Sequence, residues 1–498
     1  MDTSNFRGSS MVRKIGAAIV CGGFLAGAFG EEEGSKVELK PLSVSALQEF
    51  GMLKSGRFGA NPAFQDEWTD HFGAFVTQSA IVNEHVSFDI GLGGLFQYQK
   101  TEVKQAGWGG SQYKNFFVGP TIADIVYRRN PEDGSGFSAQ LGLFPYKYNP
   151  NAMNLGEYLF RCGPYPSYIF SGTYAMVNST ATYLQGLKTS YKIGNLTGDL
   201  LLTTETTLPV LYDWSLGAVL KYRVADGLID LGAGANYKHM IPVRPSRTTS
   251  SSPRNSYFVK NDTTWSGNVT YYQEHATFYN RIQDSARAAQ WQDYTNRVTA
   301  WIADSVDRPL YQHYTQKGVL LMASLAIDPK KLFSTEVFGE QDLKLYAEAA
   351  LLGVKNYPIF YEKQAERIPV MAGFNFPGFK ILDLIALQVE YFNSPWMNSY
   401  GQAIGESGVN AATPSIPSGS DTRSSLTEYN DIAQRDNLAW SVLLKKEVTR
   451  GAWLSAQFAR DHTRLVSIDT WAGPGVEPRE VLDTDKDWYW MLQFSFGI

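Results

Sequence analysis

Large apolar residues alternate with small or polar ones along most of the chain, and the alternation is clearest in its last eleven residues. One face of 488–498 is uniformly apolar and the other is mostly small or polar: Trp488, Trp490, Leu492, Phe494, Phe496 and Ile498 oppose Tyr489, Met491, Gln493, Ser495 and Gly497. Successive side chains of a β-strand point to opposite faces, so this period of two predicts a strand with one apolar face.

Similar segments follow one another from about residue 71. The clearest lie at 71–83, 86–99, 183–193, 214–224, 229–238, 319–328, 343–354, 366–376, 381–392, 438–448 and 452–461, while 114–127 and 137–148 fit less cleanly. They exceed the usual five or six residues of a soluble strand. Their length suits strands that cross a bilayer at a tilt. A soluble β-sandwich also alternates, but its strands are shorter, so the pattern favours an all-β transmembrane barrel.

The connections between these segments fall into two kinds that largely alternate. Short turns follow Val82, Ile193, Val224, Phe376 and Val448, whereas long connections lie near 100–113, 149–182, 241–317, 395–437 and 463–486. Bacterial barrels have short periplasmic turns, long external loops and an even number of strands. We therefore expect about sixteen antiparallel strands, in a range of about 14 to 18, with 37–46 or 55–66 supplying one strand before residue 71.

The first thirty residues have the form of a secretory signal. Arg13 and Lys14 precede an apolar run from Ile15 to Leu25, and Ala28 and Gly30 place small residues before Glu31. The sequence therefore predicts export and cleavage near Gly30, with Met11 as an alternative start. Residues 31–70 are expected to be a periplasmic lead-in or the first strand, and 71–498 the barrel.

Composition narrows the function without naming it. The formal net charge is -5 and no basic patch is present, so nucleic acid is not an expected partner. Of the two cysteines, Cys21 lies in the signal and Cys162 would remain alone, so no intramolecular disulfide is expected. Aromatic residues make up 14% of the chain, which suits the interfacial girdles of a membrane barrel.

The sequence contains no recognisable catalytic or metal-binding motif. It has no Gly-x-Ser-x-Gly, no phosphate-binding loop and no His-Glu-x-x-His, and its six histidines are scattered. Gly91-Leu-Gly-Gly-Leu lies inside an alternating strand, where small residues packing in the wall explain it. We therefore expect no catalytic site, no metal and no cofactor, and interpret the protein as a non-enzyme.

The charged residues on the inward faces of the strands are the candidate pore-lining residues. They are Lys188, Lys192, Asp199, Lys221, Arg223, Asp230, Lys238, Glu348 and Glu390. Interior charges set the ion preference of wide pores. The alternative is that opposite charges pair across neighbouring strands and simply solvate the lumen.

Two long connections have a pattern of their own. In 241–317, apolar residues recur at helical spacing, so a helix is expected between 268 and 307, either as a lid or partner surface or as a cap over the barrel mouth. The 149–182 connection is rich in aromatic residues and proline. It could fold inward and narrow the channel, bind sugar rings, or pack on itself.

Together, strand length, alternation, loop asymmetry, the signal and the aromatic final strand resemble Gram-negative outer-membrane β-barrels of the porin-like type, over residues 71–498. One departure is that Gly497-Ile498 follow Phe496 at the C-terminus. The resemblance implies an outer-membrane channel for passive diffusion, with outer-membrane lipid and small solutes as partners. A homo-oligomer is compatible with it. The alternatives are an adhesion or glycan-binding barrel acting through 149–182 and 241–317, and a barrel-embedded hydrolase.

Overall fold

The structure of the chain is a computed structural model. The structure describes residues 37–57, 63–99, 113–132, 134–160, 182–204, 212–243, 318–333, 336–354, 364–392, 438–462, 464–469, 473–480, 482 and 486–498, with scattered positions between 273 and 299. No helix in this described part is long and apolar enough to span a membrane.

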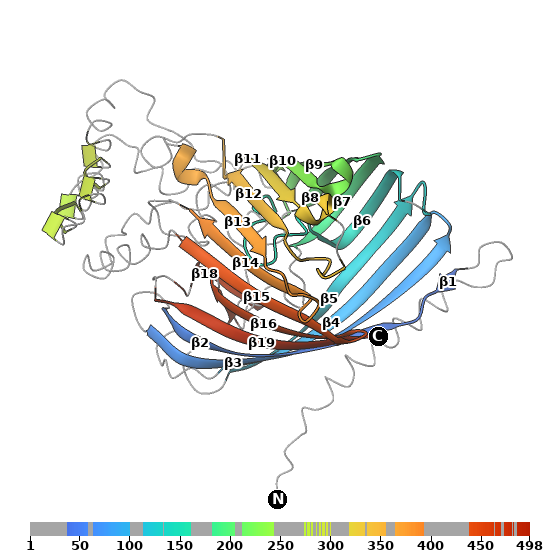
Figure 1. The fold of residues 1–498 in the computed structure, drawn as a ribbon, viewed down its shortest axis with the longest axis horizontal. Helices are drawn as coiled ribbons and strands as arrows, with labels where there is room; N and C mark the ends of the chain where they lie inside the picture. Colours follow the sequence, from blue (N-terminus) through green and yellow to red (C-terminus); the bar gives the residue numbers. More distant parts are fainter. Residues whose placement is uncertain are drawn as a thin grey trace, which may run out of the picture.

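Sixteen antiparallel strands close into one ring, which confirms the predicted barrel (Figure 1). Each strand pairs with the next along the chain, and the last pairs with the first. They are β2 (Ser43–Arg57), β3 (Ala63–Asn83), β4 (Val86–Gln99), β5 (Tyr113–Arg128), β6 (Gly136–Tyr146), β7 (Thr182–Ile193), β8 (Leu196–Thr204), β9 (Trp214–Val224), β10 (Ile229–Ile241), β11 (Gly318–Ile327), β12 (Leu345–Leu351), β13 (Val370–Asn375), β14 (Leu384–Tyr391), β15 (Leu438–Thr449), β16 (Ala452–Arg460) and β19 (Trp488–Gly497).

Three short strands lie outside the ring. β1 (Glu38–Leu39) pairs with β3 at Ile81 and Ala80. β17 (Arg464–Asp469) and β18 (Gly473–Glu480) form a separate two-stranded sheet in the last long connection. The wall itself begins at Ser43, earlier than the expected boundary at residue 71, because that boundary falls inside β3. The predicted additional strand is therefore β2, which overlaps both of the ranges expected for it.

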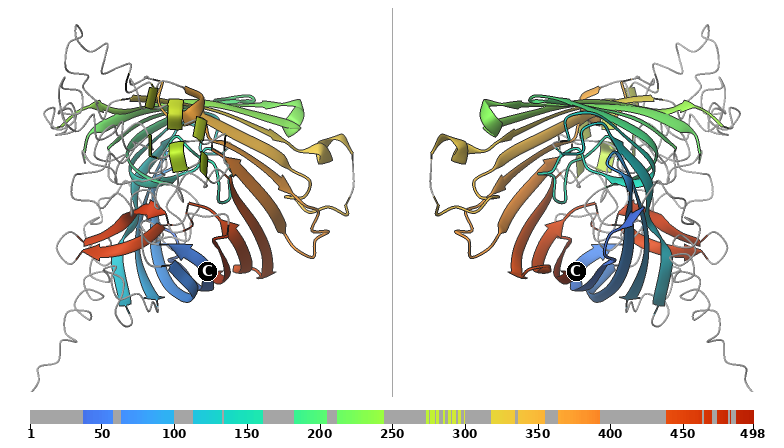
Figure 2. Two further views of the ribbon diagram at one scale, coloured as in Figure 1. Left: turned by 90° about the vertical axis from the view of Figure 1, so that its left-hand side faces the viewer. Right: turned by 90° about the vertical axis from the view of Figure 1, so that its right-hand side faces the viewer.

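Short and long connections largely alternate around the ring, as predicted, with 328–344 at one end and 58–62 at the other as exceptions. At one end, called here the turn end, the strands are joined by 84–85, 129–135, 194–195, 225–228, 328–344, 376–383 and 450–451. Two of these contain a described 3-10 turn, η1 (Ala225–Gly227) and η3 (Pro329–Leu332), and a further one, η4 (Gln364–Arg367), precedes β13 at the other end. Figure 2 shows η3, a yellow coiled ribbon, projecting from one end of the barrel.

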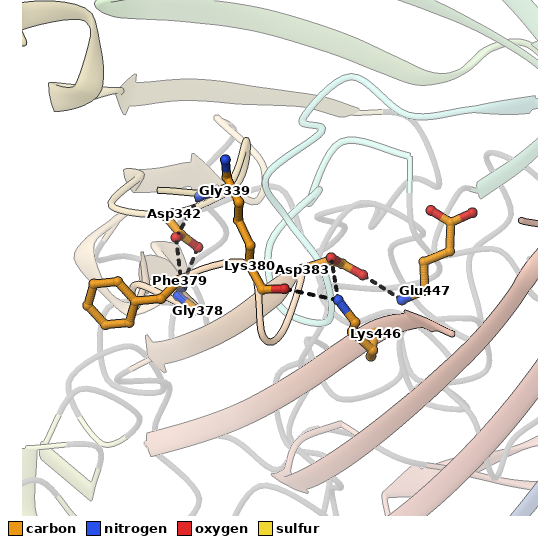
Figure 3. Close-up of polar contacts among 8 residues, drawn as sticks. All are labelled: Gly339, Asp342, Gly378, Phe379, Lys380, Asp383, Lys446 and Glu447. Atoms are coloured by element: carbon orange, nitrogen blue, oxygen red, sulfur yellow. Dashed lines mark hydrogen bonds and ion pairs between the residues drawn. The ribbon is translucent and has the colours of Figure 1, made fainter. Parts of the chain in front are cut away.

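The two longest turns are joined by a buried carboxylate. Asp342, fully buried, accepts hydrogen bonds from the backbone amides of Gly339 at 2.8 Å and Gly378 at 3.0 Å (Figure 3). A second carboxylate, on Asp383, accepts from Lys446 Nζ at 3.3 Å. The β11–β12 turn, the β13–β14 turn and the end of β15 are thus hydrogen-bonded to one another, which fixes this side of the turn end.

The two faces of the wall differ as the alternation predicts. In β19, Leu492 and Phe494 point outward and are 46% and 48% exposed, whereas Tyr489 and Met491 point inward and are 0% and 4% exposed. Large apolar residues are likewise exposed on the outside of β5, β9 and β11. The expected helix of the 241–317 connection is present, since the described positions between 273 and 299 are helical.

Candidate functional site

A pair of glycines lets the end of β6 and the start of β7 leave the wall. Gly142 in β6 faces Gly186 in β7, and both have a positive φ, of 134° and 151°. A Cβ on Gly142 would lie 2.1 Å from the carbonyl oxygen of Ala123, and one on Gly186 would lie 2.2 Å from that of Leu202. Only glycine fits such a backbone at such close approach. Beyond this point β6 no longer pairs with β5, although it still pairs with β7.

The chain that follows β6 packs against the inside of the barrel. Residues 147–160, called here the inward loop, bury Leu155, Tyr158 and Leu159 completely. These side chains join one apolar cluster with inner-wall residues from β8 to β13, which are Leu201, Val219, Leu320, Met322, Tyr346 and Met371. Each fully buried side chain of this size contributes about 1.5–3 kcal/mol, so the loop is held there largely by the hydrophobic effect. Part of the lumen is therefore filled.

Glu348 on β12 is the first polar anchor of the inward loop. Its carboxylate accepts hydrogen bonds from Tyr148 Oη at 2.6 Å, from Asn149 Nδ2 at 2.7 Å and from the backbone amide of Tyr158 at 3.1 Å. Glu348 is 1% exposed. A buried carboxylate is tolerated when its oxygens are hydrogen-bonded in this way. The same bonds orient both ends of the loop.

Three further wall residues bind the inward loop: two lie on β14 and one directly follows β16. Gln388 accepts from the backbone amides of Asn154 at 2.8 Å and Leu155 at 3.1 Å. Glu390 accepts from Tyr158 Oη at 2.6 Å, and His462 Nε2 lies 2.7 Å from its other oxygen. Asp461 accepts from Asn154 Nδ2 at 2.7 Å. Four wall residues thus bind one short loop, which indicates a fixed constriction.

The phenol of Tyr148 stays neutral in this setting. Burial away from water is the main reason that its pKa lies well above the ordinary value, and the nearby carboxylates of Glu348 and Glu157 raise the pKa further. A protonated phenol is a hydrogen-bond donor, so Tyr148 can donate to Glu348 throughout the physiological range. The loop anchor is therefore insensitive to ordinary changes of pH at this residue.

The structure divides the nine candidate pore-lining residues into two groups. Lys238, Glu348 and Glu390 are 6%, 1% and 1% exposed, the two glutamates being covered by the inward loop. The other six are partly or fully exposed on the inner faces of β7 to β10: Lys188, Lys192, Asp199, Lys221, Arg223 and Asp230.

Cross-strand ion pairing accounts for only some of these six exposed charged residues. Arg223 Nε lies 3.2 Å from Asp230 Oδ1, as expected if interior charges pair. Asp199 accepts a hydrogen bond from Tyr146 Oη at 2.8 Å. Lys188 lies over aromatic rings, with its Nζ 5.6 Å from the centroid of Phe144. The charged residues of this wall therefore differ in how far they are neutralised.

Sequence reasoning did not identify the anchors Gln388, Asp461 and His462. Gln388 shares the inward face of β14 with Glu390, so strand alternation placed it correctly but gave no reason to select an amide. Asp461 and His462 follow β16 directly, where alternation no longer applies. Residues 161–181 of the aromatic connection lie outside the described residues.

A buried His–Asp pair lies where β9 and β10 meet. His239 Nδ1 is 3.1 Å from Asp213 Oδ2, and the backbone amide of His239 donates to Ser215 Oγ at 3.0 Å. His239 has a positive φ of 50° and sits at an irregularity in the β9–β10 register. All three side chains are at most 5% exposed, so the group is placed to stabilise a bulge in the wall and is out of reach of a substrate.

Solved structures with a similar fold cover nearly the whole chain. The outer membrane channel DcaP of Acinetobacter baumannii is 9% identical, with a TM-score of 0.37 and with 94% of this chain and 99% of that chain covered. OprB of Pseudomonas putida is 10% identical, with a TM-score of 0.42 and coverages of 93% and 94%. A mutant of the Rh. blastica porin is 8% identical, with a TM-score of 0.38 and coverages of 92% and 100%. No family model and no curated protein matches the chain.

Proposed function

We propose that the protein is an outer-membrane channel through which small solutes diffuse passively. The observation that carries this proposal is a closed ring of strands with an apolar outer face and a loop packed within it. A ring of this size encloses a lumen wider than its side chains can fill. The inward loop occupies part of that lumen, and the remainder is the proposed solute path.

The exposed outer face supports the membrane location. Leu141 on β6 and Leu220 on β9 are 57% and 56% exposed, and neighbouring strands present similar residues. So extended an apolar surface is unfavourable in water and suits the hydrocarbon core of a bilayer. The partners that follow are outer-membrane lipid and the transported solutes. Chemical cross-linking in the native membrane tests whether copies of the chain also associate.

The burial of the inward loop favours a channel over glycan binding at the cell surface. Tyr158 and Phe160, two of the aromatic residues that could stack on sugar rings, are 0% and 9% exposed. They lie inside the barrel and contact its wall. This part of the 149–182 connection is therefore placed to shape a passage rather than to present aromatic rings outside.

Conductance in planar lipid bilayers tests the proposal. The purified, folded protein should give discrete current steps. The variant Glu348→Ala should give larger or noisier steps, because it removes the acceptor of three loop hydrogen bonds and loosens the constriction. Glu340→Ala, an exposed carboxylate of the β11–β12 turn, is the matched control and should leave the steps unchanged. Folded barrels that insert fully but pass no current would contradict the channel.

A further inference from the structure

The inward loop changes the charge that the lumen presents. Two of the candidate negative charges, Glu348 and Glu390, are each 1% exposed and accept hydrogen bonds from the loop. They therefore do not face the solute path. The wall from β12 to β14 loses its acidic character where the loop covers it, so the uncovered charges on β7 to β9 decide the field in the passage.

Three lysines on that wall have no carboxylate within ion-pair distance in the part of the chain that the structure describes. Lys188, Lys192 and Lys221 point inward, and none of them takes part in an ion pair among the described residues. Thr197 pairs with Lys192 on one side and with Lys221 on the other, so both lysines lie in one row. Adjacent strands are separated by about 4.8 Å, which places their backbones about 10 Å apart.

The nearby carboxylates are bonded to neutral groups. Asp199 lies two residues beyond Thr197 on β8 and accepts a hydrogen bond from Tyr146 Oη at 2.8 Å. Asp124 on β5 accepts from Gln140 Nε2 at 2.6 Å. Glu157 of the inward loop also acts electrostatically on Lys221, but Glu157 and Asp124 are 1% and 4% exposed, so of these three carboxylates Asp199 is the one that shares the lumen with the three ammonium groups.

Lys188 is held by aromatic rings, which leave its ammonium free to take an anion. Its Nζ lies 5.6 Å from the ring centroid of Phe144 and 5.7 Å from that of Tyr146. The face of an aromatic ring attracts a cation without neutralising it. Lys188 and Lys221 are only partly exposed, so each has lost part of its hydration. A solute anion placed between them restores favourable interactions to both.

We propose that Lys188, Lys192 and Lys221 form a binding site for small anionic solutes, carboxylates or phosphates, and give the lumen a preference for anions. This inference rests on the proposed channel function and adds its solute class. Rings and ladders of Lys and Arg favour anions in pores by the same electrostatics.

The reversal potential in a potassium chloride gradient measures this preference. The wild-type channel should favour chloride over potassium. Lys188→Gln and Lys221→Gln should each lower the anion-to-cation permeability ratio about sevenfold, because one unit charge at about 7 Å in water changes the occupancy of chloride and that of potassium about threefold each, in opposite directions. Lys221→Arg should preserve the ratio because it preserves the charge. Lys380→Gln, which removes an exposed lysine of the β13–β14 turn, is the matched control and should also preserve it.

Adding potassium acetate or potassium phosphate tests binding and separates the two kinds of solute. Whichever anion binds should reduce the chloride current in the wild type and not in a variant with all three lysines replaced by Gln. Neither anion reducing the current would overturn the binding site. A current without anion preference, or one that the triple replacement leaves unchanged, would overturn this inference and leave the channel standing. Absence of any current would overturn both.

Discussion

Gly186 shows how much one residue contributes to the proposed constriction. Replacing it by Ala places a Cβ 2.2 Å from the carbonyl oxygen of Leu202 and imposes a backbone angle that L residues rarely adopt. We expect Gly186→Ala to lower the free energy of unfolding by about 1–3 kcal/mol, measured by urea unfolding in detergent micelles. Gly198→Ala is the matched control, because it meets only a leucine methyl group at 3.1 Å. Equal stability of the two variants would contradict the close backbone approach at Gly186 that lets β6 and β7 leave the wall.

Leu492 and Gln493 test the two faces of the wall at adjacent positions. Leu492 points outward, whereas Gln493 points inward and donates to Glu49 Oε2 at 3.2 Å. Leu492→Lys should lower the stability of the membrane-inserted barrel by about 2–4 kcal/mol if the position lies near the membrane midplane, and should impair assembly. Gln493→Lys should be tolerated, because its ammonium can pair with Glu49. Heat-modifiable mobility of the folded barrel in detergent gels measures both, and the opposite order would mean that the faces are reversed.

The inward loop is the element on which the proposed constriction depends, and Tyr148 makes its stability dependent on alkaline pH. Burial raises the pKa of Tyr148 above its ordinary value of 10.0. Below pH 10.0 the phenol is protonated in both the folded and the unfolded chain. Above it the unfolded chain loses the proton first, so the free energy of unfolding falls as pH rises, by at most about 1.4 kcal/mol per pH unit.

The variant Tyr148→Phe should therefore reduce this alkaline loss. It is less stable than the wild type at neutral pH, since Glu348 loses a donor, but its stability should decline less steeply between about pH 8 and about pH 11. Urea unfolding midpoints across that range measure the slope. Parallel slopes for the variant and the wild type would show that Tyr148 titrates alike in the folded and unfolded states.

Strands and loops differed in how far the sequence could predict them. Strands such as β19 were placed correctly because lipid demands large apolar residues on one face. β2 was placed only loosely, because its inward face includes the buried Leu47 and Leu53 while its outward face includes Gln48 and Lys54. The inward loop could not be placed at all, since its anchors come from strands far away in the sequence and no local pattern links them.

At the scale of the whole molecule, closure of the ring depends on β19 and β2, which pair across almost the full length of the chain. Phe494 pairs with Gln48, and Leu492 pairs with Phe50. A free edge here would leave backbone amide and carbonyl groups without partners in the bilayer, so closure is a condition for insertion. This β19–β2 pairing, called here the seam, is therefore the place where an error in register would affect the entire barrel.

An engineered disulfide tests that register directly. In a background with Cys21→Ser and Cys162→Ser, the pair Phe494→Cys and Gln48→Cys should oxidise in the native membrane, since directly opposed residues bring their Cβ atoms to about 4.5–5.5 Å. The matched pair Phe494→Cys and Phe50→Cys lies on the same outer face but two residues out of register, and should form little disulfide. Mobility in non-reducing gels distinguishes the two. Preferential oxidation of the second pair would shift the seam by two residues and change which side chains of β2 meet β19 all along the closing edge.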